Sequence, residues 1–311
     1  MTKIAFVFPG QGSQHVGMLS QLAESEALVR STYDEASAVL GYDLWDLVQN
    51  GPEESLNQTD KTQPALLTAS VALWRIWQHK EGRQPDFMSG HSLGEYSALV
   101  CAEALSFQDA VQLVELRGQF MQSAVPVGEG SMAAIIGLED EAIIEACAAA
   151  AEGQVVEAVN FNSPGQVVIA GNASAVERAM LLCKEKGAKR ALPLSVSAPS
   201  HCQLMRPAAE QLAGKLAEIS MSAPTIPVVQ NVQALVESNP EKIKQNLVEQ
   251  LFKPVLWVDC VTYMVSSGVE STIECGPGKV LSGLNKRIHK SLQTLAINDV
   301  SGIEAALKLG E

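Results

Sequence analysis

The sequence lacks the cysteine spacing of a zinc site or of a disulfide framework. Its six cysteines are scattered over 311 residues, and no two of them form a C-x-x-C pair. Such pairs are typical of metal sites and redox motifs, and dense cysteine patterns are typical of small secreted domains. We therefore expect no bound metal, and we expect reduced cysteines that pack in the core as small hydrophobic side chains.

Two common phosphate-binding loops are also missing. The glycine-rich turn Pro9-Gly10-Gln11-Gly12-Ser13-Gln14 would need a glycine at the next position to be a dinucleotide fingerprint, and His15 stands there. No G-x-x-x-x-G-K-[ST] sequence occurs anywhere in the chain. We therefore expect no nucleotide-type cofactor.

Basic residues and long apolar runs are scarce. The chain has 22 lysines and arginines against 35 aspartates and glutamates, a net charge of −13. Such an acidic balance argues against nucleic-acid binding, which needs positive charge against the phosphates. No apolar run is long enough to span a membrane, and Ile4 to Phe8 is too short for a signal-peptide core. We predict a cytoplasmic monomer that binds neither nucleic acid nor membrane.

Residues 127–198 have the pattern of a small inserted domain. The predicted order is strand, helix, strand, strand, helix, strand, which is the β-α-β-β-α-β order of a ferredoxin-like unit. The corresponding ranges are Ser131–Gly137, Asp140–Ala151, Val155–Asn160, Gln166–Ala170, Ala173–Lys186 and Arg190–Val196.

The flanking segments, residues 1–126 and 199–311, alternate strands and helices and predict one α/β domain that the small domain interrupts. At 47% hydrophobic composition the chain can bury a large core. We expect an α/β-hydrolase-like large domain with a parallel sheet, and a site between the two domains. The predicted strands are Ile4–Phe8, Phe87–Ser89, Pro227–Gln230, Ser271–Glu274 and Gln293–Ala296.

The pentapeptide Gly90-His91-Ser92-Leu93-Gly94 has the G-x-S-x-G pattern of a nucleophile elbow, a strained turn that exposes a serine hydroxyl. A strand is predicted before it and a helix, Glu95 to Glu103, after it, as the motif requires. The start of that helix can offer N–H groups and a positive dipole to an oxyanion. An ordinary glycine-serine turn explains the pentapeptide by itself equally well.

Arg117 lies in the apolar stripe of a predicted helix, Phe107 to Val125, where apolar residues recur at three- and four-residue steps. A guanidinium keeps its proton and is costly to bury alone, so it needs an internal carboxylate or an anionic ligand. Recognition of a substrate carboxylate, a structural ion pair and a side chain that reaches solvent all remain possible.

A serine nucleophile needs a base, and the chain has five histidines, His15, His79, His91, His201 and His289. The histidine inside the elbow is too close in sequence to turn back onto Ser92, and three others lie in polar or basic segments or after a turn. His201 follows a proline-containing loop, and loops on a rigid scaffold often carry catalytic side chains. No acidic residue suggests itself as a third member, which leaves a main-chain carbonyl as the alternative group to orient the imidazole. A histidine on a surface loop is the competing interpretation.

The turn after the first strand is the other candidate for backbone chemistry. Gly10 and Gly12 permit close approach of the backbone to a ligand, and a loop after an early strand often supplies the second donor of an oxyanion hole. A tight turn without a functional role explains this segment equally well.

Seven motifs occur in the order seen in malonyl-CoA:acyl carrier protein transacylases, and the chain resembles that family from residue 4 to about residue 290. The motifs are Phe8-Pro9-Gly10-Gln11-Gly12-Ser13-Gln14, Thr62-Gln63-Pro64-Ala65, Gly90-His91-Ser92-Leu93-Gly94-Glu95, Arg117-Gly118, Asn160-Phe161-Asn162-Ser163-Pro164-Gly165-Gln166, Pro199-Ser200-His201 and Gly276-Pro277-Gly278.

The resemblance implies a ping-pong reaction that supplies fatty acid synthesis. Ser92 would take the malonyl group from malonyl-CoA and pass it to the phosphopantetheine thiol of acyl carrier protein. His201 would be the general base, Arg117 the carboxylate clamp, and the backbone N–H groups of Gln11 and Leu93 the oxyanion hole. Further positions implied in substrate binding are Gln63, His91, Asn160, Asn162, Ser200 and Gln250, the last through a main-chain carbonyl that holds the histidine.

The chemistry agrees with this assignment. A serine with one base and two N–H donors can open a thioester, so coenzyme A enters as part of the substrate and no cofactor is expected. A site built around a charge also rejects an acetyl group better than an apolar pocket would. The segment Ala198-Pro199-Ser200-His201 matches neither of the two common signatures of polyketide acyltransferases, so branched units such as methylmalonyl stay open.

Docking of acyl carrier protein, which is acidic in this family, requires a local reversal of charge. Basic residues cluster on two predicted surfaces, and the residues predicted to bind the partner are Lys189, Arg190, Lys286 and Arg287. Two solvated helix faces would give the same pattern.

Three other functions remain possible. A serine esterase or thioesterase would use the same serine and histidine but would release the acyl group to water. An acyltransferase of a polyketide pathway would use a different carrier protein. An acyl-carrier-binding module without catalysis would take up no acyl group.

Overall fold

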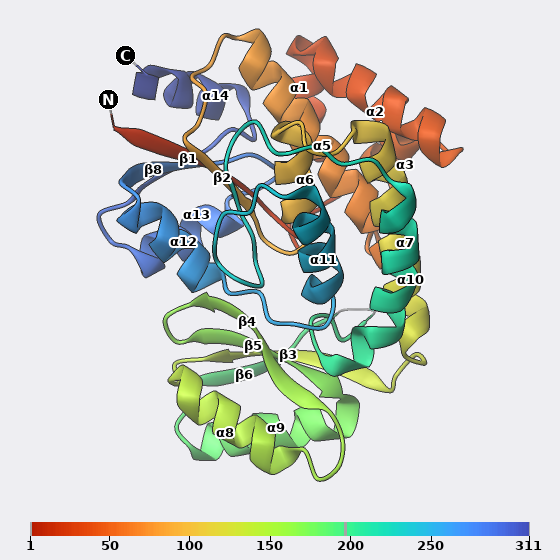
Figure 1. Ribbon diagram of the computed structural model, residues 1–311, viewed down its shortest axis with the longest axis vertical. Helices are drawn as coiled ribbons and strands as arrows, with labels where there is room; N and C mark the ends of the chain where they lie inside the picture. Colours follow the sequence, from red (N-terminus) through yellow and green to blue (C-terminus); the bar gives the residue numbers. More distant parts are fainter. Residues whose placement is uncertain (1, 196–197, 311) are drawn as a thin grey trace.

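The computed structural model describes residues 2–195 and 198–310, which form two sheets with helices around them (Figure 1). The larger sheet has five parallel strands in the order β7-β2-β1-β8-β9, and the smaller has four antiparallel strands in the order β4-β5-β3-β6. The predicted α/β class is therefore confirmed.

The strands of the parallel sheet are β1 Lys3–Phe8, β2 Phe87–Gly90, β7 Val228–Val229, β8 Val269–Glu274 and β9 Gln293–Ala296. Those of the antiparallel sheet are β3 Gly130–Ile136, β4 Val156–Ser163, β5 Gln166–Asn172 and β6 Arg190–Pro193.

The helices before the small sheet are α1 Ser20–Ser25, α2 Ala27–Leu40, α3 Leu44–Asn50, α4 Glu53–Leu56, α5 Thr59–His79, α6 Gly94–Cys101 and α7 Phe107–Ala124. The small sheet carries α8 Asp140–Ala150 and α9 Ala173–Glu185. The later helices are η1 Gln203–Met205, α10 Arg206–Glu218, α11 Pro240–Gln250, α12 Trp257–Ser266, α13 Val280–Ile288, α14 Val300–Leu307 and η2 Lys308–Gly310.

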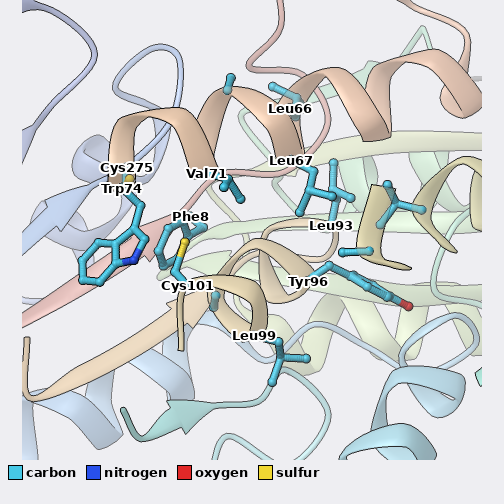
Figure 2. Packing of buried hydrophobic residues seen from close by; sticks show 14 of the residues in the cluster. Phe8, Leu66, Leu67, Val71, Trp74, Leu93, Tyr96, Leu99, Cys101 and Cys275 are labelled. Atoms are coloured by element: carbon cyan, nitrogen blue, oxygen red, sulfur yellow. The ribbon is translucent and has the colours of Figure 1, made fainter. Parts of the chain in front are cut away.

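The strand β1 lies in the middle of the parallel sheet and is buried on both faces, as expected for a strand covered by helices on both sides. On one face Phe6 packs against the rings of Trp74 and Trp77, each with centroids 5.2 Å apart. Figure 2 shows further residues of the same hydrophobic core, in which Leu67 of α5 lies near Leu93 at the start of α6. The first turn of α6 is therefore buried in the core.

The small sheet buries one face under α8 and α9 and turns the other toward the large sheet (Figure 1). On that second face Met132 and Val168 pack with Cys202, which belongs to the segment after the small sheet. The two parts also join through the main chain, because Phe161 N–H donates to Val255 O at 3.0 Å and Val255 N–H donates to Val159 O at 2.8 Å. These contacts hold the two sheets on either side of one site.

Several strand ends differ from the predicted ones. Strand β7 is only two residues long because the chain turns at Gln230, whose N–H donates to Leu235 O at 3.0 Å. Strand β4 runs on to Ser163 with irregular register, because its end pairs with the segment around Val255 as well as with β5. Strand β6 ends at Pro193, and the predicted strand end at Val196 lies outside the described residues.

All six cysteines are buried and free, as predicted. Among the described residues, no helix combines the length and the apolar character that crossing a bilayer would require.

Candidate active site

The predicted elbow is a sharp turn between β2 and α6. Ser92 has a φ of 53°, in the left-handed region that a residue with a side chain rarely adopts. A Cβ at Gly90 would lie 1.8 Å from the carbonyl carbon of Gly94, and a Cβ at Gly94 would lie 2.0 Å from Phe8 O. Both positions therefore require glycine, and the two contacts force the serine outward at the end of the strand.

Ser92 and His201 meet although 109 residues separate them. The distance from Ser92 Oγ to His201 Nε2 is 2.8 Å, and His201 Nδ1 lies 2.6 Å from Gln250 O. A carbonyl oxygen can only accept, so Nδ1 carries the proton and Nε2 is free to accept the serine proton. The orienting group is thus a main-chain carbonyl, in line with the absence of an obvious acid from the sequence.

The imidazole of His201 is 3% exposed. Burial, together with the nearby Arg117 guanidinium, lowers the pKa of His201 to about 3. The ring is therefore neutral at physiological pH and available as a base.

Arg117 is 1% exposed and faces Ser92. Its Nη1 donates to Gln63 Oε1 at 2.8 Å, and its Nη2 donates to Gln250 Oε1 at 3.1 Å and to Ser92 Oγ at 3.3 Å. Its Nε, also buried, has no hydrogen-bond partner in the described part of the chain. No carboxylate of the described residues forms an ion pair with it at 4.0 Å or less. The guanidinium is therefore held by neutral amides and retains a donor for an anion.

These side chains border a cavity of about 110 Å³. Of the predicted site residues, those that line it are Gln11, His91, Ser92, Leu93, Arg117, Asn160, Ser200 and His201. Its apolar wall was not predicted from the sequence and consists of Met121, Met132, Leu194 and Ala198. Met121, Met132 and Leu194 look like ordinary packing residues in the sequence, whereas Ala198 belongs to the segment Ala198-Pro199-Ser200-His201 that was compared with the polyketide acyltransferase signatures.

Gln11 and Leu93 line this cavity together with Ser92, and the backbone N–H of neither residue donates to another group within residues 2–195 and 198–310. Gly10 lets the turn after β1, which contains Gln11, approach the elbow closely, since a Cβ at position 10 would lie 2.6 Å from His91 O. Both donors are thus left available to a ligand.

Three residues predicted to bind substrate do not line the cavity. Gln63 and Gln250 lie behind Arg117 and accept its hydrogen bonds. Asn162 instead pairs with His91, at 2.7 Å between Oδ1 and Nε2, while the His91 ring packs at 5.6 Å from Trp257. Burial lowers the pKa of His91, so the neutral ring donates to Asn162 and ties strand β4 to the elbow.

A family model described as "Acyl transferase domain" matches residues 5–306. The chain belongs to this acyl transferase family. The malonyl CoA-acyl carrier protein transacylase of Escherichia coli strain K12 is 62% identical to it over 309 residues, which cover 99% of this chain and 100% of that protein.

Solved structures are equally similar to this acyl transferase. A crystal structure of an acyl carrier protein S-malonyltransferase from Vibrio cholerae has a TM-score of 0.96 at 64% identity, over 98% of this chain and 99% of that chain. A malonyl-transacylase solved in complex with its holo type II polyketide synthase acyl carrier protein has a TM-score of 0.98 at 56% identity, over 99% and 100% of the two chains.

The acyl transferase site includes an asparagine that the sequence interpretation did not assign to it. Asn231 Oδ1 accepts from Ser92 N–H at 2.8 Å, and its Nδ2 donates to Gly90 O at 2.7 Å. It therefore braces both sides of the elbow. A signal existed, because a polar residue just after strand β7 lies at the same edge of the parallel sheet as the residue after β2, its neighbour.

The four basic residues predicted to bind the partner are exposed on the acyl transferase: Lys189, Arg190, Lys286 and Arg287. Arg287 Nη1 donates to Gln166 Oε1 at 2.8 Å. In the small sheet Ile136 of β3 pairs with Gln166 of β5 on one side and with Arg190 of β6 on the other. The two basic clusters, far apart in sequence, therefore adjoin each other where α13 meets the small sheet.

Proposed function

We propose that this acyl transferase moves the malonyl group of malonyl-CoA to the phosphopantetheine thiol of an acyl carrier protein through a malonyl ester on Ser92. The observation that carries the proposal is Arg117, a buried cation whose guanidinium faces the serine and has no carboxylate of the described residues within 4.0 Å. The names of the E. coli and V. cholerae relatives support the donor group and the acceptor.

In the first half-reaction His201 Nε2 takes the Ser92 Oγ proton as Oγ attacks the thioester carbonyl carbon. The resulting oxyanion accepts hydrogen bonds from the N–H groups of Gln11 and Leu93. When the carbon–sulfur bond breaks, the thiol leaves with the proton from His201. The second half-reaction runs the same steps in reverse with the carrier thiol as nucleophile, so no proton is gained or lost.

Arg117 binds the free carboxylate of the malonyl group in both half-reactions. Gln63 and Gln250 hold its two terminal nitrogens, so the planar guanidinium is already oriented before substrate arrives. A preoriented fork of donors costs little to order on binding and discriminates against acyl groups that have no carboxylate.

The finer description of the fold is also a proposal. The small sheet combines the β-α-β-β-α-β chain order with the spatial order β4-β5-β3-β6, which supports a ferredoxin-like domain at residues 127–198. The serine elbow at the end of a parallel strand supports an α/β-hydrolase-like domain made of residues 1–126 and 199–311. The monomeric state and the cytoplasmic location stay predictions.

The proposed function is tested by incubating the protein with malonyl-CoA and locating the covalent adduct by intact mass and peptide mapping. We expect one malonyl group, on Ser92, that a carrier thiol removes faster than water does. Ser92→Ala is the matched control and should carry no adduct. Loss of the adduct to water would indicate a thioesterase, and absence of any adduct on the wild-type protein would indicate a binding module.

The acceptor and the branched substrates need separate comparisons. Equal rates with carrier proteins of fatty acid and polyketide synthesis would leave the pathway open, whereas a preference would assign it. Methylmalonyl-CoA in the same assay tests whether the wall at Met132 and Leu194 leaves room for an additional methyl group.

We propose that the adjoining basic clusters receive the acidic carrier protein. Reversing the charge with Lys286→Glu and Arg287→Glu is expected to reduce malonyl transfer to the carrier at low salt about tenfold, because both attraction and encounter rate fall. Transfer to free pantetheine should stay at the wild-type rate. Lys215→Glu with Lys242→Glu changes the net charge equally on α10 and α11 and is the control. Unchanged transfer to the carrier would remove the α13 cluster from the docking surface.

A further inference from the structure

A buried carboxylate lies next to the nucleophile, and the steps above do not use it. Glu95 stands in the first turn of α6, three residues after Ser92, and is 0% exposed. Its Oε2 accepts from Asn231 N–H at 2.8 Å and from Gln250 Nε2 at 3.0 Å. Its Oε1 is buried and has no hydrogen-bond partner in the described residues. An anion buried this way is costly, so its retention needs a compensating charge.

The compensating charge is Arg117, and Gln250 connects the two groups. The amide of Gln250 donates through Nε2 to Glu95 and accepts through Oε1 from Arg117 Nη2. Its main-chain carbonyl holds His201 at the same time. Because the two ends of an amide differ, a carboxylate at the nitrogen end forces the oxygen end toward the guanidinium. One residue therefore links the carboxylate, the clamp and the base.

We propose that Glu95 is a positioning residue that serves as the internal counter-charge of Arg117, and that the carboxylate of the bound malonyl group competes with it for the guanidinium. The proposal rests on the proposed function, since it concerns how strongly the clamp attracts a carboxylate. An ionised Glu95 holds Arg117 in place but repels the incoming anion. A neutral Glu95 leaves the full positive charge to the substrate.

Glu95 can change its charge in the physiological range. Burial raises the pKa of Glu95 to about 7, against the opposing effects of its hydrogen bonds and of Arg117. The other titratable groups near it do not titrate there. Burial raises the pKa of Tyr96, whose ring lies 5.4 Å from the Arg117 guanidinium, to about 12, and it raises that of Cys260 on α12.

Burial lowers the pKa of both histidines of the site, that of His201 to about 3, so neither changes its charge as the pH rises through 7. Below pH 7 Glu95 is protonated and malonyl-CoA reacts well. As the pH rises through 7 the carboxylate ionises and the attraction of the clamp for malonyl falls.

The test measures kcat/KM for malonyl-CoA, which reports ionisations of the free enzyme, in wild type and in Glu95→Gln. For wild type we expect a fall of about tenfold between about pH 6 and about pH 8, the size of a screened repulsion between two carboxylates. Glu95→Gln keeps acceptors for Asn231 and Gln250, and it should stay near the low-pH value throughout. Acetyl-CoA, which has no second carboxylate, should show no such fall with either protein.

Glu274→Gln is the matched control, because Glu274 on β8 is equally buried but accepts from the N–H groups of Leu281 and Ser282, on α13. It should keep the wild-type profile. If Glu95 had a purely structural role, Glu95→Gln would lower kcat/KM for both malonyl-CoA and acetyl-CoA at every pH. A wild-type pH profile retained in Glu95→Gln would overturn the proposal, and failure of the wild-type protein to acquire malonyl at all would instead overturn the proposed function.

A second measurement uses wild type alone and applies if Glu95→Gln does not fold. Since acylation itself is balanced in protons, any uptake on malonylation reports a change of ionisation. At pH 7 we expect uptake of a fraction of a proton with malonyl-CoA, measured with a pH indicator in weak buffer, and none with acetyl-CoA. No uptake with malonyl-CoA would contradict the competition between Glu95 and the substrate.

Discussion

Replacing His201 with alanine is expected to slow malonylation of Ser92 about 10²- to 10⁴-fold, the usual contribution of a positioned general base. The 2.8 Å contact from Ser92 Oγ to Nε2 is lost, and His91, the other histidine that lines the cavity, is engaged with Asn162. Single-turnover release of coenzyme A at saturating malonyl-CoA measures the effect.

The pH dependence separates loss of the base from loss of structure. A pKa of about 3 keeps His201 unprotonated from mildly acidic to mildly alkaline pH, so the wild-type single-turnover rate should be flat there. Without the imidazole, solvent has to take the serine proton, and the residual rate should rise with pH. Cys202→Ala is the control, because that buried side chain is the next in sequence, does not line the cavity and packs with Val159 and Val168. A flat, unimpaired rate in His201→Ala would assign the base elsewhere.

Replacing Arg117 with alanine is expected to reduce the preference for malonyl-CoA over acetyl-CoA about 10²- to 10³-fold, since truncating one partner of a buried charge pair costs that much in binding. The preference falls because reaction with malonyl-CoA becomes slower. Acetyl-CoA has no free carboxylate for the guanidinium to bind. Competition between the two substrates for Ser92, with the adducts read by intact mass, measures the ratio directly.

Two variants show whether the fork of donors matters beyond its charge. Arg117→Lys keeps a cation but cannot donate to Gln63 and Gln250 as a planar fork, so it should restore only part of the preference. Arg75→Ala removes an arginine of α5 that pairs with Glu35 at 2.8 Å and should leave the preference intact. A ratio unchanged in Arg117→Ala would mean that another group recognises the carboxylate.

The sequence predicted the elements of the fold better than their ends. Hydrophobic periodicity and glycine placement suffice for β1, α7 and the βαββαβ segment, because each depends on residues close together in the chain. Strands β7 and β4 were predicted with different ends, since those ends depend on a turn at Gln230 and on a bridge to Val255. Contacts between distant segments leave no periodic signal.

The same division holds for the site. Ser92 and His201 could be predicted from local motifs, and Arg117 from a charge placed in an apolar stripe. The apolar wall could not, because Met121 and Leu194 look like ordinary packing residues and acquire their role only by facing one cavity. The contact of Asn162 with His91 joins segments 71 residues apart and could not be predicted either, and the role of Asn162 in substrate binding stays a prediction.

By itself the sequence determined the sharp turn at Ser92, because the glycines at positions 90 and 94 and the strained serine between them act within five residues. Only the tertiary structure decided what surrounds that serine. Asn231 and Gln250 reach it across separations of 139 and 158 residues, at the edge where neighbouring parallel strands end. A buried amide or carboxylate has a role only through its partners, and folding, not sequence proximity, brings Glu95, Gln250 and Arg117 together.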